Sequence, residues 1–414
     1  MISRINIRNY KGLYDFSFSP EGNNGFIYGE NGSGKSCFAD AMYFLMRSMR
    51  TLLDNDMVYS LPSRVQGLYP ELESEELLYH LRSSKGSLVE LLRRGRSISA
   101  SSGPSFELEF RRNDKKFIYS VSFDEGGVIR ESLASEYGDR MLKLFSFSPD
   151  EIFLSPAAFS DNSYKKELLD KIERYYGQNT FMSILYSELM SSSARYFRGK
   201  VSEDLSSAMD FLSDISIVSE EGIIPSSIFR RADISRGYSD SLPEKERKDI
   251  ERMINLYLPY VLPMYTRAYY RTYIAGSREC YELWFEKKGA SIPISSESKG
   301  IQNLVKLFPF FLSALMGETV IIDATDSGIS DRILLGIYNS LDNDAEGQLI
   351  ASVASEYIVS NLSKDHIYII SNMNGRNVIN LYSSESIKES TKLLNADEKV
   401  LLEFREMIGD LSLK

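Results

Sequence analysis

One glycine-rich segment constrains the fold of this chain more than any other feature. Its eight residues match the pattern G-x-x-x-x-G-K-[ST] at every position: Gly29, Glu30, Asn31, Gly32, Ser33, Gly34, Lys35 and Ser36. A short apolar stretch, Phe26–Tyr28, precedes the segment, and apolar residues at helical spacing follow it to about Leu53. A strand, a glycine loop and a helix in this order predict a phosphate-binding loop within an α/β sheet.

Each part of the segment has a use in binding phosphate. The glycines allow several backbone N–H groups to surround an anion. The helix that begins at Lys35 directs its positive end to the same point. The Lys35 ammonium suits the β- and γ-phosphates, and the Ser36 hydroxyl suits Mg²⁺. We therefore expect residues 29–36 to bind ATP together with Mg²⁺.

An apolar run that ends in a carboxylate forms the second motif. Residues Thr319–Asp323, with the sequence TVIID, predict a buried strand whose last side chain reaches a magnesium ion. Such strands are common in α/β proteins, so the run gains its weight from the phosphate loop beside it. The predicted magnesium residues are Ser36 and Asp323.

The composition of the 414-residue chain is that of a globular protein with a core, with 43% hydrophobic and 26% charged residues. Its cysteines, Cys37 and Cys280, have no CxxC spacing, which argues against structural zinc and favours a reducing compartment. The N-terminus lacks the apolar region of a signal peptide. The most apolar stretch, Leu304–Leu315, contains Lys306 and Pro309 and is too short to cross a bilayer. A cytoplasmic protein is expected.

The net charge of −10 makes the protein as a whole repel phosphate backbones. Basic runs occur at 93–96 and 111–116, where a solvated face or a hairpin turn explains them more simply. Nucleic acid is therefore a partner that the net charge does not support.

Hydrophobic patterning divides the chain into four parts. Residues 1–150 form an N-terminal lobe with the phosphate loop and an antiparallel hairpin of FELEF (106–110) and FIYSVSF (117–123). Residues 151–272 read as a mainly helical insertion, and 273–385 as a C-terminal lobe of alternating strands and helices. Residues 386–414 read as a C-terminal helix or tail. Both terminal thirds therefore contribute to one α/β core of the P-loop type.

With these motifs in place, the chain resembles the ABC-type ATPases of the RecF, SMC and OLD group. It is most similar to the ATPase components of prokaryotic antiphage and abortive-infection systems. INIRNYKG followed by GFIYGENGSGKS looks like the first hairpin and phosphate loop of that group, and SESKG (296–300) looks like its signature motif. The resemblance covers about residues 1–50 and 275–385. Taken alone, SESKG fits any capped helix start equally well.

The resemblance implies a dimer in which two chains enclose two ATP molecules. In such a dimer, Ser298 and Gly300 would cap the γ-phosphate bound by the other copy. Ser327 and Gly328 would belong to the D-loop, the short segment that follows the magnesium strand.

Two departures from the family concern hydrolysis. Members that hydrolyse ATP carry a Glu after the magnesium Asp and a His after a later strand, and the matching positions here are Ala324 and Ala354. The loss of a general base typically lowers the rate about 10²–10⁴-fold. No catalytic residue is assigned, and weak or absent hydrolysis is expected. Ala324 fits either a natural departure from the family or an engineered change.

The sequence thus favours an ATP-gated dimeric switch, the sensor or regulatory ATPase of an antiphage system, which contacts an effector or sensor protein through residues 151–272. The alternative is an active DNA-associated ATPase of RecF or SMC type, which would need Asp326 or Glu297 as a replacement carboxylate. An ATP-binding subunit of a transporter fits the order of the motifs poorly.

Overall fold

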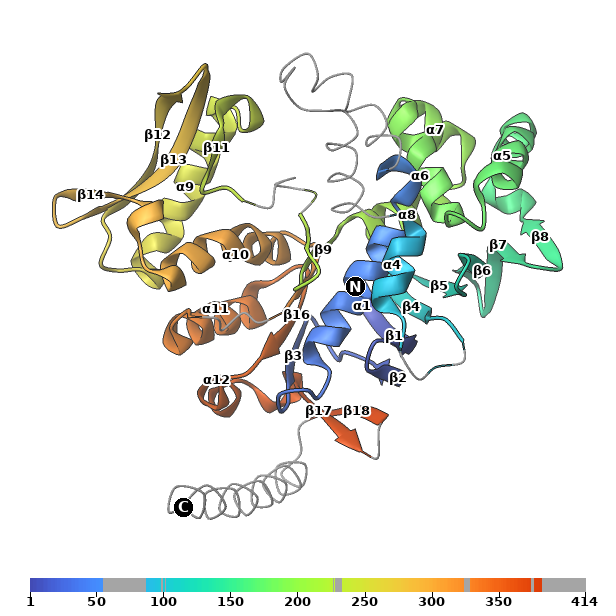
Figure 1. Ribbon diagram of the computed structural model, residues 1–414, viewed down its shortest axis with the longest axis horizontal. Helices are drawn as coiled ribbons and strands as arrows, with labels where there is room; N and C mark the ends of the chain where they lie inside the picture. Colours follow the sequence, from blue (N-terminus) through green and yellow to red (C-terminus); the bar gives the residue numbers. More distant parts are fainter. Residues whose placement is uncertain are drawn as a thin grey trace, which may run out of the picture.

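The computed structural model describes residues 1–54, 87–97, 100, 102–225, 227, 233–323, 328–373 and 376–381. Three sheets organise this part of the chain, with a helical unit on one side of the molecule and a small sheet on the other (Figure 1). Among the described residues, no helix has both the length and the apolar composition that a membrane crossing requires. The predicted C-terminal helix or tail, 386–414, lies outside the described residues.

The central sheet carries the phosphate loop. Its strands lie in the spatial order β10 (Ile223–Ile224), β9 (Ile215–Val218), β15 (Thr319–Ile322), β16 (Gln348–Val353), β3 (Asn24–Tyr28), β17 (Ile367–Met373) and β18 (Arg376–Leu381). From β9 to β17 all neighbours are parallel, so their carboxyl ends meet at one edge of the sheet. Four helices accompany these strands in the sequence: α1 (Lys35–Ser48), α10 (Lys299–Leu315), α11 (Asp331–Asp344) and α12 (Glu356–Asn361).

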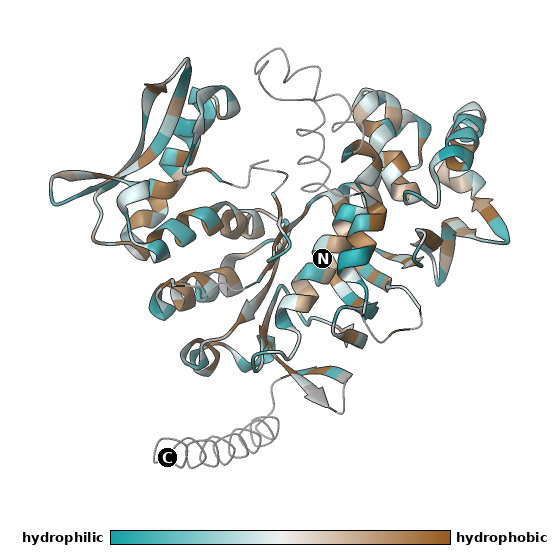
Figure 2. Ribbon diagram, in the orientation of Figure 1, coloured by the Kyte–Doolittle hydropathy of each residue, from teal (hydrophilic) through white to brown (hydrophobic). Residues whose placement is uncertain are grey.

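The innermost strands are apolar along their whole length. Every residue of β15 and β16 is buried, as expected for parallel strands that are covered on both faces. Figure 2 shows these central strands in brown, whereas helix α5 (Asn162–Tyr175), at the edge of the molecule, is largely teal. The prediction of an α/β core completed by both ends of the chain is confirmed, because β3 pairs with β16 and β17.

The N-terminal lobe contains an antiparallel sheet. Its strands lie in the order β2 (Leu13–Phe18), β1 (Ile2–Tyr10), β4 (Ser105–Arg112), β5 (Lys115–Phe123), β6 (Val128–Tyr137), β7 (Arg140–Ser148) and β8 (Glu151–Leu154). The predicted hairpin is confirmed as β4 and β5, which turn at Asn113 and Asp114 with φ angles of 51° and 60°. The apolar face of this sheet packs on α1, where Phe44 stacks on Phe106 at 5.4 Å between ring centroids.

The residues of the range 151–272, predicted as a mainly helical insertion, belong to three parts of the fold. The first part of this range forms the helical unit, made of α5, α6 (Phe181–Ser191), α7 (Ala194–Lys200) and α8 (Glu203–Ser213). Strands β9 and β10 then join the central sheet, where β9 lies beside β15. The helical pattern of the sequence did not reveal this pairing, because β9 is only four residues long and its partner lies about 100 residues away.

The last part of that range belongs to a third sheet. The strands of this sheet are β11 (Arg236–Tyr238), β13 (Arg278–Lys287), β12 (Arg267–Ala275) and β14 (Ala290–Pro293), and helix α9 (Glu244–Val261) lies between β11 and β12 in the sequence. The sequence patterning up to residue 272 predicted helix, but β12 is a strand paired antiparallel with β13. Its tyrosines and its Thr272 and Ile274 favour extended backbone once a partner strand is present.

A buried carboxylate joins the N-terminal sheet to the helical unit. Glu131 of β6 is 1% exposed and accepts hydrogen bonds from the first two N–H groups of α6, at Phe181 and Met182. The hydroxyl of Tyr119 donates a third bond at 2.9 Å. Burial raises the pKa of Glu131 to about 7, although these three donors act in the opposite direction.

This pKa predicts how the stability depends on pH. Because the folded value lies above the ordinary 4.5, the stabilising contribution is complete below pH 4.5 and is lost as the pH rises through about 7. We expect the free energy of unfolding, relative to Glu131→Gln, to fall by roughly 3 kcal/mol between these limits, at about 1.4 kcal/mol per pKa unit. Urea unfolding at several pH values measures this difference. The exposed Glu151→Gln is the control, and an equal pH dependence in all three proteins would contradict the assignment.

Candidate functional site

The phosphate loop connects β3 to α1 at the carboxyl edge of the central sheet. Gly32 and Gly34 have φ angles of 80° and 107°, which residues with a side chain rarely adopt. Between them, the N–H of Ser33 donates to the carbonyl of Glu30 at 3.1 Å and closes a turn. The predicted order of strand, glycine loop and helix is confirmed, with α1 beginning at Lys35.

Two glycines of the loop lie directly against the last strands of the central sheet. A Cβ atom on Gly29 would come within 2.4 Å of the Ile370 carbonyl oxygen in β17. One on Gly34 would come within 2.7 Å of the Asn377 amide nitrogen in β18. These two positions therefore require glycine for packing as well as for phosphate access.

The side chain of Lys35 lies across the loop. Its ammonium donates to the carbonyls of Gly29 and Glu30, the latter at 2.9 Å. Ser36 follows as the second residue of α1. The positive side chain, the amino end of the helix and a hydroxyl are thus gathered at one point, which is the arrangement that binds a polyphosphate.

Asp323 lies at the same edge of the sheet, directly after β15. Its N–H donates to the Val218 carbonyl at 2.8 Å, and one carboxylate oxygen accepts from the Ser352 hydroxyl at 2.5 Å. The residue is 7% exposed, and its other oxygen makes no hydrogen bond with the described part of the chain. A buried, unpaired carboxylate oxygen fits a hard cation.

The residues present therefore suit magnesium. Ser36 and Asp323 would hold it, and the nucleotide phosphates would supply further oxygens. Within the described residues, no group of three or more His, Cys, Asp or Glu side chains forms a metal cage. Mg²⁺ is commonly bound by one or two protein carboxylates together with phosphate oxygens.

The predicted signature segment begins α10. Ser298 is the exposed residue at its N-terminus, and its hydroxyl makes no capping hydrogen bond within the described structure. Gly300 lies in the first turn, where an added Cβ would come within 2.0 Å of the Gly328 carbonyl oxygen. Gly328 itself has a φ of 77°. The structure thus brings Gly300 and Gly328 of one chain together, a contact that the sequence did not reveal.

The positions that concern hydrolysis contain no base. Ala354 is exposed and follows β16, while Ala324 and Ser327 lie outside the described residues. Tyr28 lies at the end of β3, but burial and then the Glu356 carboxylate raise its pKa, so its phenol stays protonated at neutral pH. His366 precedes β17 and lies at the opposite, amino edge of the sheet. Neither Tyr28, which stays protonated, nor His366, at the amino edge, can act as the base that activates a water molecule.

The sequence matches one known protein family over most of its length. A family profile described as "AAA domain, putative AbiEii toxin, Type IV TA system" matches residues 26–352, from β3 to the penultimate residue of β16. No curated protein matches the chain. The match confirms the prediction of a P-loop ATPase related to abortive-infection systems.

Similar solved structures are SMC head domains. One, bound to the C-winged helix domain of ScpA, is 13% identical and has a TM-score of 0.46, with 94% of this chain and 99% of that chain covered. The SMC head from Thermotoga maritima is 11% identical, with a TM-score of 0.41 and 92% and 99% covered. A third, bound to the C-terminal domain of ScpA derived from Pyrococcus furiosus, is 13% identical, with a TM-score of 0.42 and 96% and 99% covered.

The contact between Gly300 and Gly328 makes a prediction about stability without nucleotide. In most helices Gly→Ala stabilises by up to about 1 kcal/mol. We expect Gly300→Ala to destabilise the free protein by about 1–3 kcal/mol instead, because its Cβ meets the Gly328 carbonyl. Gly336→Ala in α11 is the matched control, since an added Cβ there meets nothing within 4 Å. Urea unfolding of both variants checks this, and two equally stabilised variants would refute it.

Proposed function

Because the chain belongs to the family of AAA domains described as putative AbiEii toxins of type IV toxin–antitoxin systems, we propose that it is an ATP-gated dimeric switch. The observation that carries the proposal is the phosphate loop at one sheet edge with Asp323, followed in the sequence by Ala324. The described residues of this site include groups that bind Mg-ATP, and Ala324 occupies the position of the usual catalytic carboxylate. Two chains would enclose two ATP molecules, each between the loop of one copy and Ser298 of the other.

A switch of this kind depends on binding energy. ATP shifts the equilibrium toward the closed dimer only because it binds that state more tightly than the open one. The size of the shift equals the difference between the two binding free energies. Without a general base, hydrolysis is slowed about 10²–10⁴-fold, which prolongs the closed state. The chain therefore suits a role in which bound ATP is a signal.

A buried hydrogen-bond network links α1, which begins at the phosphate loop, to the helical unit. The Ser48 carbonyl, at the end of α1, accepts from the hydroxyl of Thr180, the residue that caps α6. The Thr51 hydroxyl donates to the Asn179 side chain at 2.8 Å, and the Ser183 hydroxyl accepts from the Leu52 N–H at 2.8 Å. A shift of α1 on nucleotide binding would reach α6 directly, because buried polar groups resist separation.

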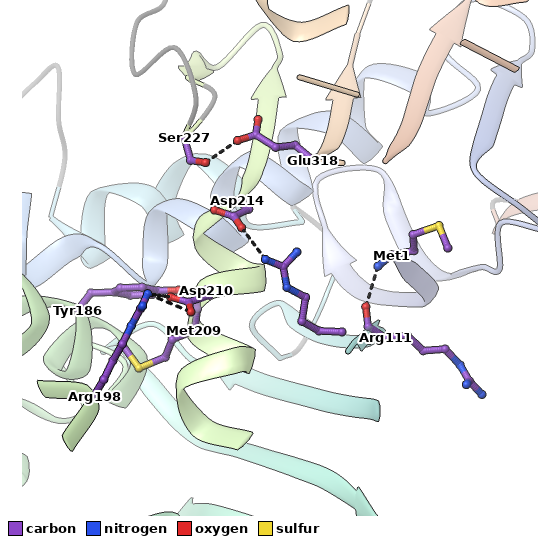
Figure 3. A network of polar contacts seen from close by, with 10 residues as sticks. Met1, Arg111, Tyr186, Arg198, Met209, Asp210, Asp214, Ser227 and Glu318 are labelled. Carbon is purple, nitrogen blue, oxygen red and sulfur yellow. Dashed lines mark hydrogen bonds and ion pairs between the residues drawn. The ribbon is translucent and has the colours of Figure 1, made fainter. Parts of the chain in front are cut away.

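A second connection runs from the helical unit to Asp323. Helix α8 continues into β9, whose last residue, Val218, accepts the Asp323 N–H. The start of β9 is held by Asp214, which pairs with Arg112 of β4 at 3.3 Å (Figure 3). Within the helical unit, Arg198 pairs with Asp210 at 3.0 Å, also drawn in Figure 3. Both nucleotide motifs are therefore connected to the same helical unit, the phosphate loop through α6 and Asp323 through α8.

Exposed apolar side chains on the helical unit support a role in binding a partner protein. These side chains are Leu169, Tyr175, Met190 and Tyr196, and Met190 and Tyr196 are more than half exposed. Exposed Tyr and Met are typical of interface centres. We assign this surface, within residues 162–213, to a partner protein, with the chain acting as the sensor or regulatory ATPase of an antiphage defence system and the partner as its effector or sensor.

Mg-ATP binding and turnover test the nucleotide part of the proposal. We expect tight binding by the unaltered chain, negligible turnover, and loss of binding in Lys35→Ala. Ala324→Glu restores the missing carboxylate, and a gain in turnover of about 10²-fold or more is expected. Isothermal calorimetry and phosphate release measure these quantities. Fast turnover by the unaltered chain would overturn the switch, and turnover stimulated by DNA would favour the DNA-associated alternative.

Light scattering tests the dimer. With Mg-ATP, the mass should rise from 47.1 kDa to about twice that value, and Ser298→Glu should abolish the rise because its charge would face the γ-phosphate of the partner. Ser298→Glu should still bind ATP as a monomer, which separates it from Lys35→Ala. A mass that ATP leaves at 47.1 kDa under saturating binding would contradict the sandwich arrangement.

A further inference from the structure

Asn377 occupies an unusual place for an asparagine. It is the second residue of β18, it is 4% exposed, and it lies beside the phosphate loop although about 340 residues separate the two in the sequence. Strand β18 runs antiparallel to β17, so it begins at the carboxyl edge of the sheet, where the loop lies. Buried asparagines are uncommon in strands, since both ends of the amide need partners.

The amide contacts the loop at two neighbouring residues. Its Nδ2 donates a hydrogen bond to the carbonyl of Ser33. The same nitrogen lies 2.7 Å from the point where a Cβ of Gly34 would stand, so no larger residue than glycine fits there. The side chain of Leu13 in β2 lies 3.2 Å from the same point. Both β18 and β2 therefore contribute an atom close to the position that a Cβ of Gly34 would occupy.

The hydrogen bond orients one peptide group of the loop. In a trans peptide, the carbonyl and the following N–H point in opposite directions. Because the Ser33 carbonyl is directed to Asn377, the Gly34 N–H faces away from β18. An N–H that is fixed in this way can contribute to an anion site, whereas a rotated peptide would present a repelling carbonyl to phosphate.

The oxygen end of the Asn377 amide does not contribute a hydrogen bond to the described fold. The Oδ1 of Asn377 is buried and makes no hydrogen bond with the described part of the chain. The Ser33 hydroxyl is likewise buried without such a bond. Groups left unpaired in this way are rare and costly in native proteins, and they concentrate at functional sites. A purely structural position would be served better by an apolar residue such as Ile379, which lies two residues further along β18 and packs against the core.

We propose that Asn377 is a positioning residue, which fixes the Ser33–Gly34 peptide of the phosphate loop and thereby sets the affinity for nucleotide. This inference rests on the proposed nucleotide binding. It extends the site to a strand near the end of the described chain, outside the range 26–352 that the family profile matches. It also gives Gly34 a reason beyond backbone freedom, since its contact with Asn377 leaves no space for a side chain.

The experiment compares Asn377→Asp with Asn380→Asp. Asn380 lies on the same strand but is exposed, so its variant carries the same charge change away from the loop. At about pH 8, we expect Asn377→Asp to weaken Mg-ATP binding about tenfold or more, because a carboxylate cannot donate to the Ser33 carbonyl and repels phosphate. Binding by Asn380→Asp should match the unaltered chain.

The pH profile distinguishes positioning from a general loss of structure. A buried carboxyl has a raised pKa and is protonated as the pH falls toward 5, when it can donate again. The affinity of Asn377→Asp, divided by that of Asn380→Asp at the same pH, should therefore recover several-fold. Asn377→Ala, which lacks the donor and the charge, should bind about fivefold or more weakly at every pH. Asn377→Ala also tests the proposal if Asn377→Asp does not fold.

Three results would count against the inference or against the proposed function. An affinity of Asn377→Ala within twofold of the unaltered chain would overturn the proposal, as would an Asn377→Asp that folds and shows no recovery at low pH. Failure of the unaltered chain to bind Mg-ATP would instead overturn the proposed nucleotide function on which this inference rests.

Discussion

The close packing of the phosphate loop on the last two strands of the sheet is the constraint on which the rest of the site depends. Gly29 lies against the Ile370 carbonyl and Gly34 against Asn377, so neither position has space for a side chain. The amino end of α1 and the Lys35 ammonium are then presented at one edge of the sheet. Because β16 separates β3 from β15, Asp323 reaches the same edge from two strands away.

The packing around the proposed nucleotide site connects it to the helical unit. Helix α1 ends in a buried polar network with α6, and Asp323 is bonded to the strand that continues α8. Glu131 holds the amino end of α6 to the antiparallel sheet from the other side. Such connections are effective because packed interiors move as rigid bodies, and small displacements at one end are carried to the other. In the proposed switch, these connections would carry the effect of bound ATP to the helical unit.

Sequence patterning predicted the local elements well where short-range physics decides them. The hairpin of β4 and β5, the helix after the phosphate loop and the buried run TVIID each follow from alternation, helical spacing or burial within a few residues. Within the range 151–272, predicted as mainly helical, it missed strand β9, and it was wrong about helix up to residue 272, where β12 lies. There, β9 and β12 are extended because partner strands distant in the sequence satisfy their backbone groups.

The sequence by itself determined that this chain contains a phosphate loop and a carboxylate strand, since both motifs carry their chemistry within eight residues or fewer. Tertiary structure alone decided what surrounds them. The pairing of Asn377 with Ser33, and of Gly300 with Gly328, joins residues far apart along the chain. The physical reason is that a close approach between two backbones depends on how strands and helices pack. A single sequence shows where a glycine is, but it does not show which atoms lie against that glycine.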